Sequence, residues 1–194
     1  MQKLDKYTRL FDIKNNNNSK GLDMLIIEQN LKHSKPLVIN SFNLFQTPQK
    51  IVEKMLSFVS TKNKTVLEPS AGLGMILKNI KDADKITAID NSKDCVKYLY
   101  ENFRNINLIE GDFLKLDLPK FDLAVMNPPF KNGLDIKHIL RAKEICKEVV
   151  FLCYNGSRQN KILKPICDYW EVLPENSFKE SGTNASVCLG LIRN

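Results

Sequence analysis

The sequence predicts an α/β fold in which helices cover both faces of a mainly parallel sheet of seven strands. From about residue 48 onward, short apolar runs alternate with amphipathic stretches of helical spacing, as in a parallel sheet with helical crossovers. The last two apolar runs, 168–173 and 186–192, have no helical stretch between them. This final pair of strands should therefore be antiparallel.

The elements follow one another in a regular order. Seven short apolar runs are expected as strands, at 65–70, 85–90, 106–113, 121–127, 148–154, 168–173 and 186–192. Helices are expected at 48–60, 74–81, 92–105, 135–147 and 158–168. Ile51, Met55 and Phe58 would share one face of the first helix, and Ser92 is a suitable N-cap for the third.

Length and composition indicate one globular domain with a short extension. A chain of 194 residues can enclose a sizeable core, and 43% hydrophobic with 26% charged residues is usual for a soluble protein. Residues 1–40 are polar and contain the run NNNNS at 15–19, so we expect an N-terminal extension there and the main domain at 41–194. The net charge of +7 is compatible with a polyanionic partner.

The cysteines and histidines do not predict a metal site. No two of the five cysteines form a C-x-x-C pair, and both histidines lie far from any cysteine cluster. No apolar run approaches the ~20 residues that cross a bilayer. The N-terminus also lacks the apolar stretch of a signal peptide. We therefore expect reduced thiols, no membrane segment and a cytoplasmic location.

Residues that could bind a ligand or take part in catalysis lie at the carboxyl ends of four predicted strands. They are E-P-S-A-G-L-G at 68–74, Asp90, Asp112 with Phe113, and N-P-P-F at 127–130. Ligands of parallel sheets bind beyond the carboxyl ends of the strands. Each segment alone could be an ordinary turn or strand cap, but four matched strand ends together favour a ligand site.

The first three segments suit a nucleoside. Glycines at 72 and 74 permit a tight turn whose backbone N–H groups can approach a ligand closely. Asp90 follows about twenty residues later, where a carboxylate can accept both hydroxyls of a ribose. Asp112 can accept a hydrogen bond from an adenine amino group, with Phe113 beside the ring.

These motifs resemble those of class I S-adenosylmethionine-dependent methyltransferases, and most of all those of small bacterial and phage-type N6-adenine methyltransferases. The resemblance covers roughly residues 42–194 and implies a Rossmann-like sheet. F-Q-T-P at 45–48 is similar to the segment that closes over the methionine part of the cofactor, although Thr47 would equally suit a helix N-cap. The resemblance implies S-adenosylmethionine as cofactor, bound by Phe45, Thr47, Pro48, Glu68, Ser70, Ala71, Gly72, Gly74, Asp90, Asp112, Phe113 and Asn127.

The expected catalytic residues are Asn127, Pro128, Pro129 and Phe130. An exocyclic amine on an aromatic ring is a poor nucleophile, because its lone pair is delocalised into the ring. The Asn127 side-chain carbonyl and the Pro128 main-chain carbonyl can accept its two N–H bonds and stabilise the positive charge that grows on nitrogen. The prolines stiffen the loop, and Phe130 offers a face on which a base can stack for ~1–3 kcal/mol.

The substrate contacts are less sharply defined. Phe178, Lys131 and His138 are candidates, although a core position for Phe178 and a half-exposed helix position for His138 are equally ordinary. Several cations could form a basic rim for phosphates or simply a solvated face: Lys131, Lys137, Arg141, Arg158, Lys161 and Lys164.

The expected substrate is adenine N6 in DNA, extruded from the helix. Only residues 1–40 and the loops 130–135 and 174–186 remain for target recognition, so a protein partner is expected to assist. Methylation of structured RNA, of cytosine N4 or of protein glutamine stays open as an alternative. So does a non-catalytic subunit that retains the fold.

Overall fold

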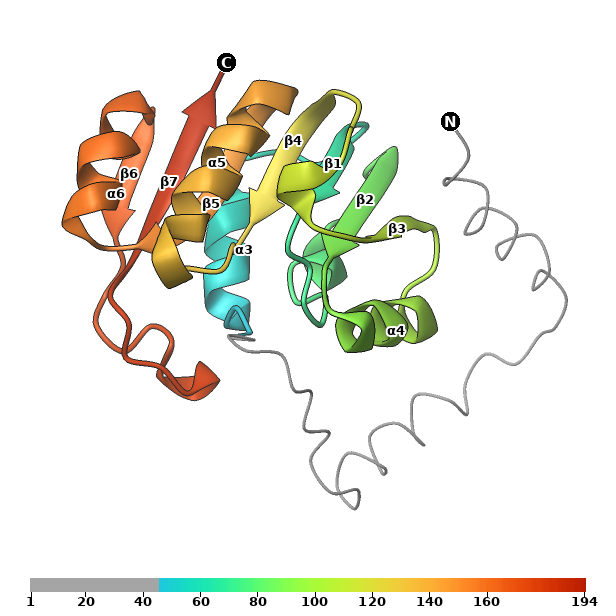
Figure 1. Ribbon diagram of the computed structural model, residues 1–194, viewed down its shortest axis with the longest axis horizontal. Helices are drawn as coiled ribbons and strands as arrows, with labels where there is room; N and C mark the ends of the chain where they lie inside the picture. Colours follow the sequence, from blue (N-terminus) through green and yellow to red (C-terminus); the bar gives the residue numbers. More distant parts are fainter. Residues whose placement is uncertain (1–45) are drawn as a thin grey trace, which may run out of the picture. The chain divides into compact units, whose positions relative to one another are not determined.

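The computed structural model describes residues 46–194. Within this range seven strands form one sheet in the order β3-β2-β1-β4-β5-β7-β6 (Figure 1). Their bounds are Thr65–Glu68 (β1), Lys85–Asp90 (β2), Ile106–Glu110 (β3), Phe121–Met126 (β4), Cys146–Tyr154 (β5), Tyr169–Val172 (β6) and Val187–Arg193 (β7). Strands β1 to β5 pair in parallel, whereas β7 runs antiparallel to both β5 and β6. The predicted fold class and the antiparallel final pair are confirmed.

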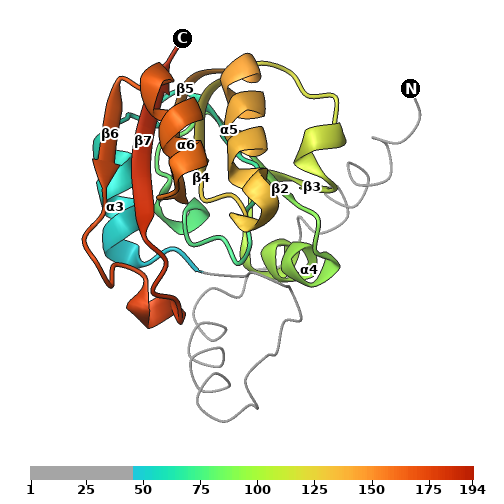
Figure 2. The same cartoon turned by 60° about the vertical axis from the view of Figure 1, so that its left-hand side comes forward.

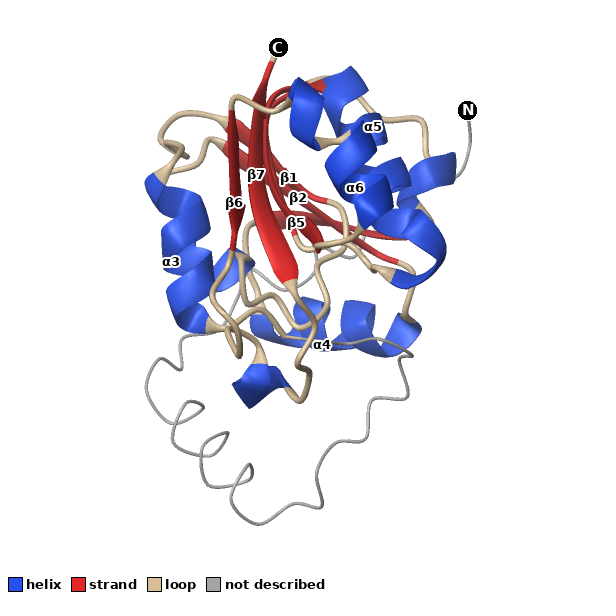
Figure 3. Ribbon diagram, turned by 90° about the vertical axis from the view of Figure 1, so that its left-hand side faces the viewer, coloured by secondary structure: helices blue, strands red, loops and turns tan. Residues whose placement is uncertain are grey.

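Helices cover both faces of the sheet, as Figure 3 shows from the side. Helices α3 (Gln49–Ser57) and α4 (Lys93–Asn102) contribute to one apolar cluster. Helix α5 (Leu134–Ile145) contributes to a second cluster on the opposite face, which α6 (Ser157–Ile162) also covers. Each cluster excludes water from one side of the central strands, which is the main source of the fold's stability.

The central strand β4 shows how burial on both faces of the sheet determines which residues a strand contains. Leu123 and Val125 point into the α3 cluster, and Ala124 and Met126 point into the α5 cluster. Successive side chains of a strand face opposite sides, so a strand covered on both sides must be apolar throughout. The continuous apolar run that predicted this strand therefore reflects its burial on two faces.

The predicted helix at 74–81 is wrong. The structure has only one short 3₁₀ helix there, Leu77–Asn79. The Asn79 side chain donates to the Met75 carbonyl at 2.9 Å, and Ile80 leaves the helical region with ψ 119°. A side chain that bonds the preceding turn competes with a regular helix, so the segment ends after one turn.

Other boundaries differ by a few residues. Strand β1 ends at Glu68 and β3 at Glu110, so the ligand loops begin earlier than predicted. The predicted helix at 158–168 is two pieces, α6 and the 3₁₀ helix Lys164–Ile166, because Pro165 has no N–H for a helical bond. The Ser92 cap is confirmed, since its hydroxyl accepts from the Cys95 N–H.

Some predictions lie outside the described residues. They are the extension at 1–40, its boundary with the domain at 41–194, and the cofactor contact of Phe45. Along residues 46–194, none of the helices combines the length and apolar character that a bilayer crossing demands.

Candidate active site

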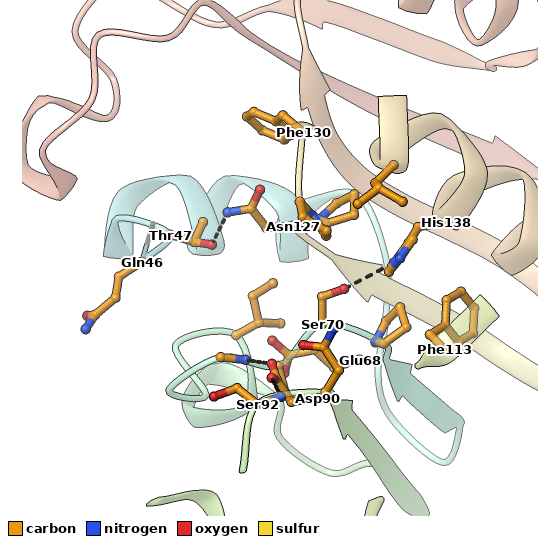
Figure 4. Close-up of a pocket in the computed structure, with 18 of the residues that line it drawn as sticks. Gln46, Thr47, Glu68, Ser70, Asp90, Ser92, Phe113, Asn127, Phe130 and His138 are labelled. Atoms are coloured by element: carbon orange, nitrogen blue, oxygen red, sulfur yellow. Dashed lines mark hydrogen bonds between the residues drawn. The ribbon is translucent and has the colours of Figure 1, made fainter. Parts of the chain in front are cut away.

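The carboxyl ends of β1, β2, β3 and β4 open into one cavity of about 580 Å³ (Figure 4). Most residues predicted for the site line it, including all four residues of the N-P-P-F loop. These residues are Thr47, Glu68, Ser70, Ala71, Gly72, Asp90, Asp112, Phe113, Asn127, Pro128, Pro129, Phe130, Lys131, His138 and Phe178. Two predicted contacts, Pro48 and Gly74, are not part of this lining. The structure thus brings together segments that are up to 131 positions apart, from Thr47 to Phe178.

The loop after β1 is fastened to the end of β2. The Gly72 N–H donates to Asp90 Oδ2 at 2.8 Å, and the Ser92 N–H donates to Asp90 Oδ1 at 2.8 Å. Gly72 has φ 53° and Gly74 has φ 73°, a region that glycine enters without strain. Burial raises the pKa of Asp90, while these backbone donors lower it in part. Each carboxylate oxygen keeps lone-pair capacity for a ligand hydroxyl.

Glu68 is the most unusual charge-bearing residue of the cavity. It is 2% exposed, and its Oε2 has no hydrogen-bond partner among residues 46–194. Burial, and next the neighbouring Asp90 carboxylate, raise the pKa of Glu68 well above its usual value, although the Leu77 N–H lowers it somewhat. A buried oxygen without a donor is costly, so a bound group that donates a hydrogen bond would relieve this penalty.

Asp112 and Phe113 line the cavity just after the carboxyl end of β3. Asp112 accepts from the Leu114 N–H at 3.1 Å and pairs with the Lys115 ammonium at 3.2 Å. Burial raises the pKa of Asp112, but these donors outweigh it and the pKa lies below the usual value. Phe113 is buried and borders the cavity with its ring. The pair is therefore an ionised acceptor next to an apolar wall.

Asn127 is oriented by a residue that lies 80 positions before it. Its Nδ2 donates to the Thr47 hydroxyl at 3.0 Å (Figure 4). Thr47 is buried just before α3, whose N-cap is Pro48, so the prediction of Thr47 as the helix N-cap is wrong. Because the amide nitrogen is engaged, the Asn127 carbonyl oxygen is the end of the group that remains to accept a hydrogen bond.

His138 is buried rather than half-exposed, at 7% exposure. Its Nδ1 shares a hydrogen bond of 3.2 Å with Ser70 Oγ, and its ring lies 5.4 Å from the ring of Phe113 (Figure 4). Burial lowers the pKa of His138, and the Asp112 carboxylate opposes this only in part. The imidazole is therefore neutral at pH 7 and joins α5 to the loop after β1.

The segment before β7 completes the cavity wall. Phe178 is 2% exposed and belongs to the α3 apolar cluster, against which Phe130 also packs. Ser181 Oγ donates to the Gln46 carbonyl at 2.6 Å, which ties this segment to the residues before α3. Phe178 is thus a core residue that also borders the cavity, and its contact with substrate stays a prediction.

Sequence reasoning missed several lining residues. Asn91 could have been found, because it directly follows the strand that ends with Asp90. Gln46 belongs to the F-Q-T-P segment, and Ser92, Gly111 and Leu114 adjoin predicted strand ends, so local pattern points to these as well. The remaining residues reach the cavity only through the tertiary fold: Met75, Ile76, Leu134, Thr183, Ala185 and Val187. Among residues 46–194, no three His, Cys, Asp or Glu side chains gather closely enough to hold a metal ion.

Comparisons with known proteins bear on the family and the fold of the chain. The family model described as "Methyltransferase small domain" matches residues 50–161. The "Probable ribosomal RNA small subunit methyltransferase A" of Methanosarcina mazei is 37% identical over 76 residues, which cover 37% of this chain and 28% of the relative. The chain spans between 25% and 39% of the length of the curated relatives it matches.

Solved structures share the fold at low identity. A dimethyladenosine transferase from Plasmodium falciparum has a TM-score of 0.59 at 22% identity, over 78% of this chain and 64% of that one. The methyltransferase subunit of a type I restriction-modification system from Streptococcus thermophilus has a TM-score of 0.63 at 18% identity, over 77% and 45%. At such identities the likeness concerns the sheet and its helices.

Proposed function

Since the chain belongs to the methyltransferase small domain family, whose class I fold and amino-methyltransferase motifs it carries, we propose that it methylates N6 of adenine in RNA with S-adenosylmethionine as methyl donor. One observation supports this proposal more strongly than any other. The N-P-P-F loop and the cofactor-type loop after β1 line the same cavity, and Thr47 holds the Asn127 amide with its nitrogen occupied.

The residues of the cavity fit the proposed cofactor. Asp90 retains acceptor capacity for ribose hydroxyls, and the ionised Asp112 beside Phe113 suits an adenine edge and ring. The unpartnered Glu68 oxygen suits a cationic donor such as the ammonium of a methionine moiety. When bound, S-adenosylmethionine supplies an electrophilic methyl group on a sulfonium sulfur.

The chain's own contribution to the reaction is to position and stabilise the amine. The Asn127 side-chain oxygen and the Pro128 carbonyl accept its N–H bonds and draw nitrogen toward tetrahedral geometry. Both acceptors also stabilise the positive charge that develops during attack. Phe130 borders the cavity and can stack on the base. A strong base is unnecessary, because the amine becomes acidic only after it has gained the methyl group.

RNA is preferred over the DNA substrate expected from the motifs. The curated relatives are named as ribosomal RNA methyltransferases, and two of them share 37% and 40% of residues in the aligned part. The names of these relatives support RNA as the substrate, and the residues that line the cavity support methylation of an amine. DNA stays the second candidate, because the motifs also resemble those of small bacterial and phage-type N6-adenine methyltransferases.

The test has two stages. Calorimetric titration with S-adenosylmethionine and its demethylated product should show binding; its absence at millimolar cofactor would favour a non-catalytic subunit. Incubation with radiolabelled cofactor and separate pools of RNA, DNA and protein should then label RNA, and digestion should release N6-methyladenosine. Recovery of N6-methyldeoxyadenosine, N4-methylcytosine or methylglutamine instead would contradict the RNA adenine assignment.

A further inference from the structure

Four exposed cations lie on the turn that follows the N-P-P-F loop or on the two helices next to it. They are Lys131, Lys137, Arg158 and Lys161, here named the Gly133 basic cluster. Lys131 lines the cavity, and Lys137 lies in the first turns of α5, directly after the turn. Arg158 and Lys161 lie three positions apart on α6, which runs beside α5 on the same face of the sheet (Figure 2).

Arg158 is tied to this turn by close packing. Its Nη1 lies 3.0 Å from the position that a Cβ on Gly133 would occupy. Asn132 and Gly133 both have positive φ, 57° and 70°, so the chain folds back sharply at this point. The absence of a side chain at 133 lets the guanidinium rest over the backbone next to the reactive loop.

Carboxylates do not neutralise the cluster within residues 46–194. None of its four members takes part in a salt bridge there, whereas six ion pairs occur elsewhere in that range. Asp135 is near in sequence but fully buried. Its oxygens accept from the backbone N–H groups of Ile136 and Tyr154 and from Gln159 Nε2.

The structure also sorts the candidate basic rim into two groups. Arg141 pairs with Glu144 at 3.1 Å and donates to the Leu116 carbonyl, so its charge is already used within the protein. Lys164 begins the 3₁₀ helix after α6 and is further along the chain from the cavity turn. The Gly133 basic cluster is what remains at the mouth.

From this geometry we infer that the Gly133 basic cluster binds the phosphates of the strand that flanks the target base. The inference rests on the proposed function and adds to it the surface over which the nucleic acid runs. Unpaired cations next to a cavity attract a polyanion and release its counterions on contact. A base extruded into the cavity leaves its neighbouring phosphates at the rim, where Lys131 lines the cavity and Arg158 packs on the adjoining turn.

The test compares two variants with the same change of charge. The first is Lys137→Gln/Arg158→Gln/Lys161→Gln, which spares Lys131 because it lines the cavity. The matched control is Lys62→Gln/Lys81→Gln/Lys85→Gln, whose exposed lysines lie at the amino ends of β1 and β2, away from the cavity. Fluorescence anisotropy measures the binding of a labelled, single-stranded RNA that contains adenine, in about 50 to 200 mM KCl.

The cluster variant should bind this RNA about 100-fold more weakly than wild type near 0.1 M salt, because each lost phosphate contact costs about fivefold. The slope of log affinity against log salt should fall by about 2. The control should change affinity by less than about threefold, since its charges are screened at that distance. Equal losses in both variants, or wild-type affinity in the cluster variant, would overturn the inference.

Failure of this inference and failure of the proposed function give different results. Calorimetry should show the same affinity for S-adenosylmethionine in both variants as in wild type, which establishes that the site is intact. If wild type binds cofactor and methylates RNA but the cluster variant retains its RNA affinity, only the inference is wrong. If wild type methylates no RNA, the proposed function is wrong, and the anisotropy comparison still decides whether the cluster binds phosphates.

Discussion

The nitrogen and the oxygen of the Asn127 side-chain amide have different roles. Its nitrogen donates to Thr47, so the side chain is held before any ligand arrives. A pre-oriented acceptor costs no reorganisation during the reaction, which is why such groups contribute strongly to turnover. Thr47 acts through Asn127 in this respect and is a positioning residue.

This arrangement predicts graded effects on turnover. Asn127→Ala should lower kcat by about 10² to 10³, because an acceptor of the transition state is lost. Thr47→Val should lower kcat by about tenfold, because the amide loses one hydrogen bond and can rotate. Steady-state methyl-transfer kinetics measure both, and calorimetry should show that cofactor affinity is retained in Asn127→Ala. A Thr47→Val enzyme with normal kcat but weak cofactor binding would assign Thr47 to the cofactor alone.

We expect Glu68 to lower the stability of the fold near neutral pH while it strengthens cofactor binding. Its pKa is raised in the folded state, so its protonation favours folding and this stabilisation is lost as pH rises. Glu68→Gln should therefore raise the melting temperature more at pH 8 than at pH 5, as scanning calorimetry would measure. The same variant should bind S-adenosylmethionine at least about tenfold more weakly, which corresponds to about 1.4 kcal/mol. Unchanged affinity would remove Glu68 from the cofactor site.

At this scale the sequence predicted the residue types of the site well but not their mutual contacts. Asp90 ends β2, and Asp112 and Asn127 come within two residues of the ends of β3 and β4, so local pattern reveals their positions. The bond between Thr47 and Asn127 and the bond between Ser70 and His138 could not, since each joins segments that only the tertiary fold brings together.

Among the elements, the loop after β1 depends on how closely it packs on α4. A Cβ on Gly74 would lie 2.4 Å from the Phe103 ring and 2.9 Å from the Leu99 side chain, and φ there is 73°. Gly74 is therefore a packing residue of the loop rather than a lining residue of the cavity. Its role is to let the loop and the C-terminal part of α4 approach each other.

Gly74→Ala should thus destabilise the fold by about 2 to 4 kcal/mol, from backbone strain and from overpacking together. Gly182→Ala is the matched control, because Gly182 has φ 80° but nothing within 4 Å of the added Cβ. The control should cost only the backbone term, about 1 to 2 kcal/mol. Urea unfolding followed by circular dichroism measures both, and equal losses would show that the Phe103 contact relaxes freely.

The elements also show where sequence patterns fail. Strand β2 was predicted with its bounds intact, because its centre is buried and both of its ends, Lys85 and Asp90, are polar. The helix predicted at 74–81 was wrong because the apolar spacing at Ile76, Leu77 and Ile80 reflects burial, whereas the chain leaves the helical region at Ile80 after a single turn. Apolar periodicity indicates which side chains are buried, and a single helical turn is enough to produce that pattern.

For the whole molecule, the cavity lies between loops from both halves of the sheet, so ligand binding should stabilise the entire domain. At a cofactor concentration of one hundred times Kd, the gain is about 2.7 kcal/mol, or a rise of about 5 to 10 °C in melting temperature. Differential scanning fluorimetry should show this with S-adenosylmethionine and with its demethylated product, and a much smaller rise with ATP. No rise with either ligand would contradict the cofactor assignment.

The position of β7 has a consequence for how the domain is made. Residues 187–193 lie between β5 and β6, so the edge of β5 stays open while the preceding chain leaves the ribosome. Segment 183–187 also supplies part of the cavity wall. Both the sheet and the site are thus closed by the same late insertion. At synthesis rates of about 5 to 20 residues per second, the nascent chain exposes the unpaired edge of β5 for seconds. An exposed strand edge can pair with other chains, so a chaperone would be of most use during this period.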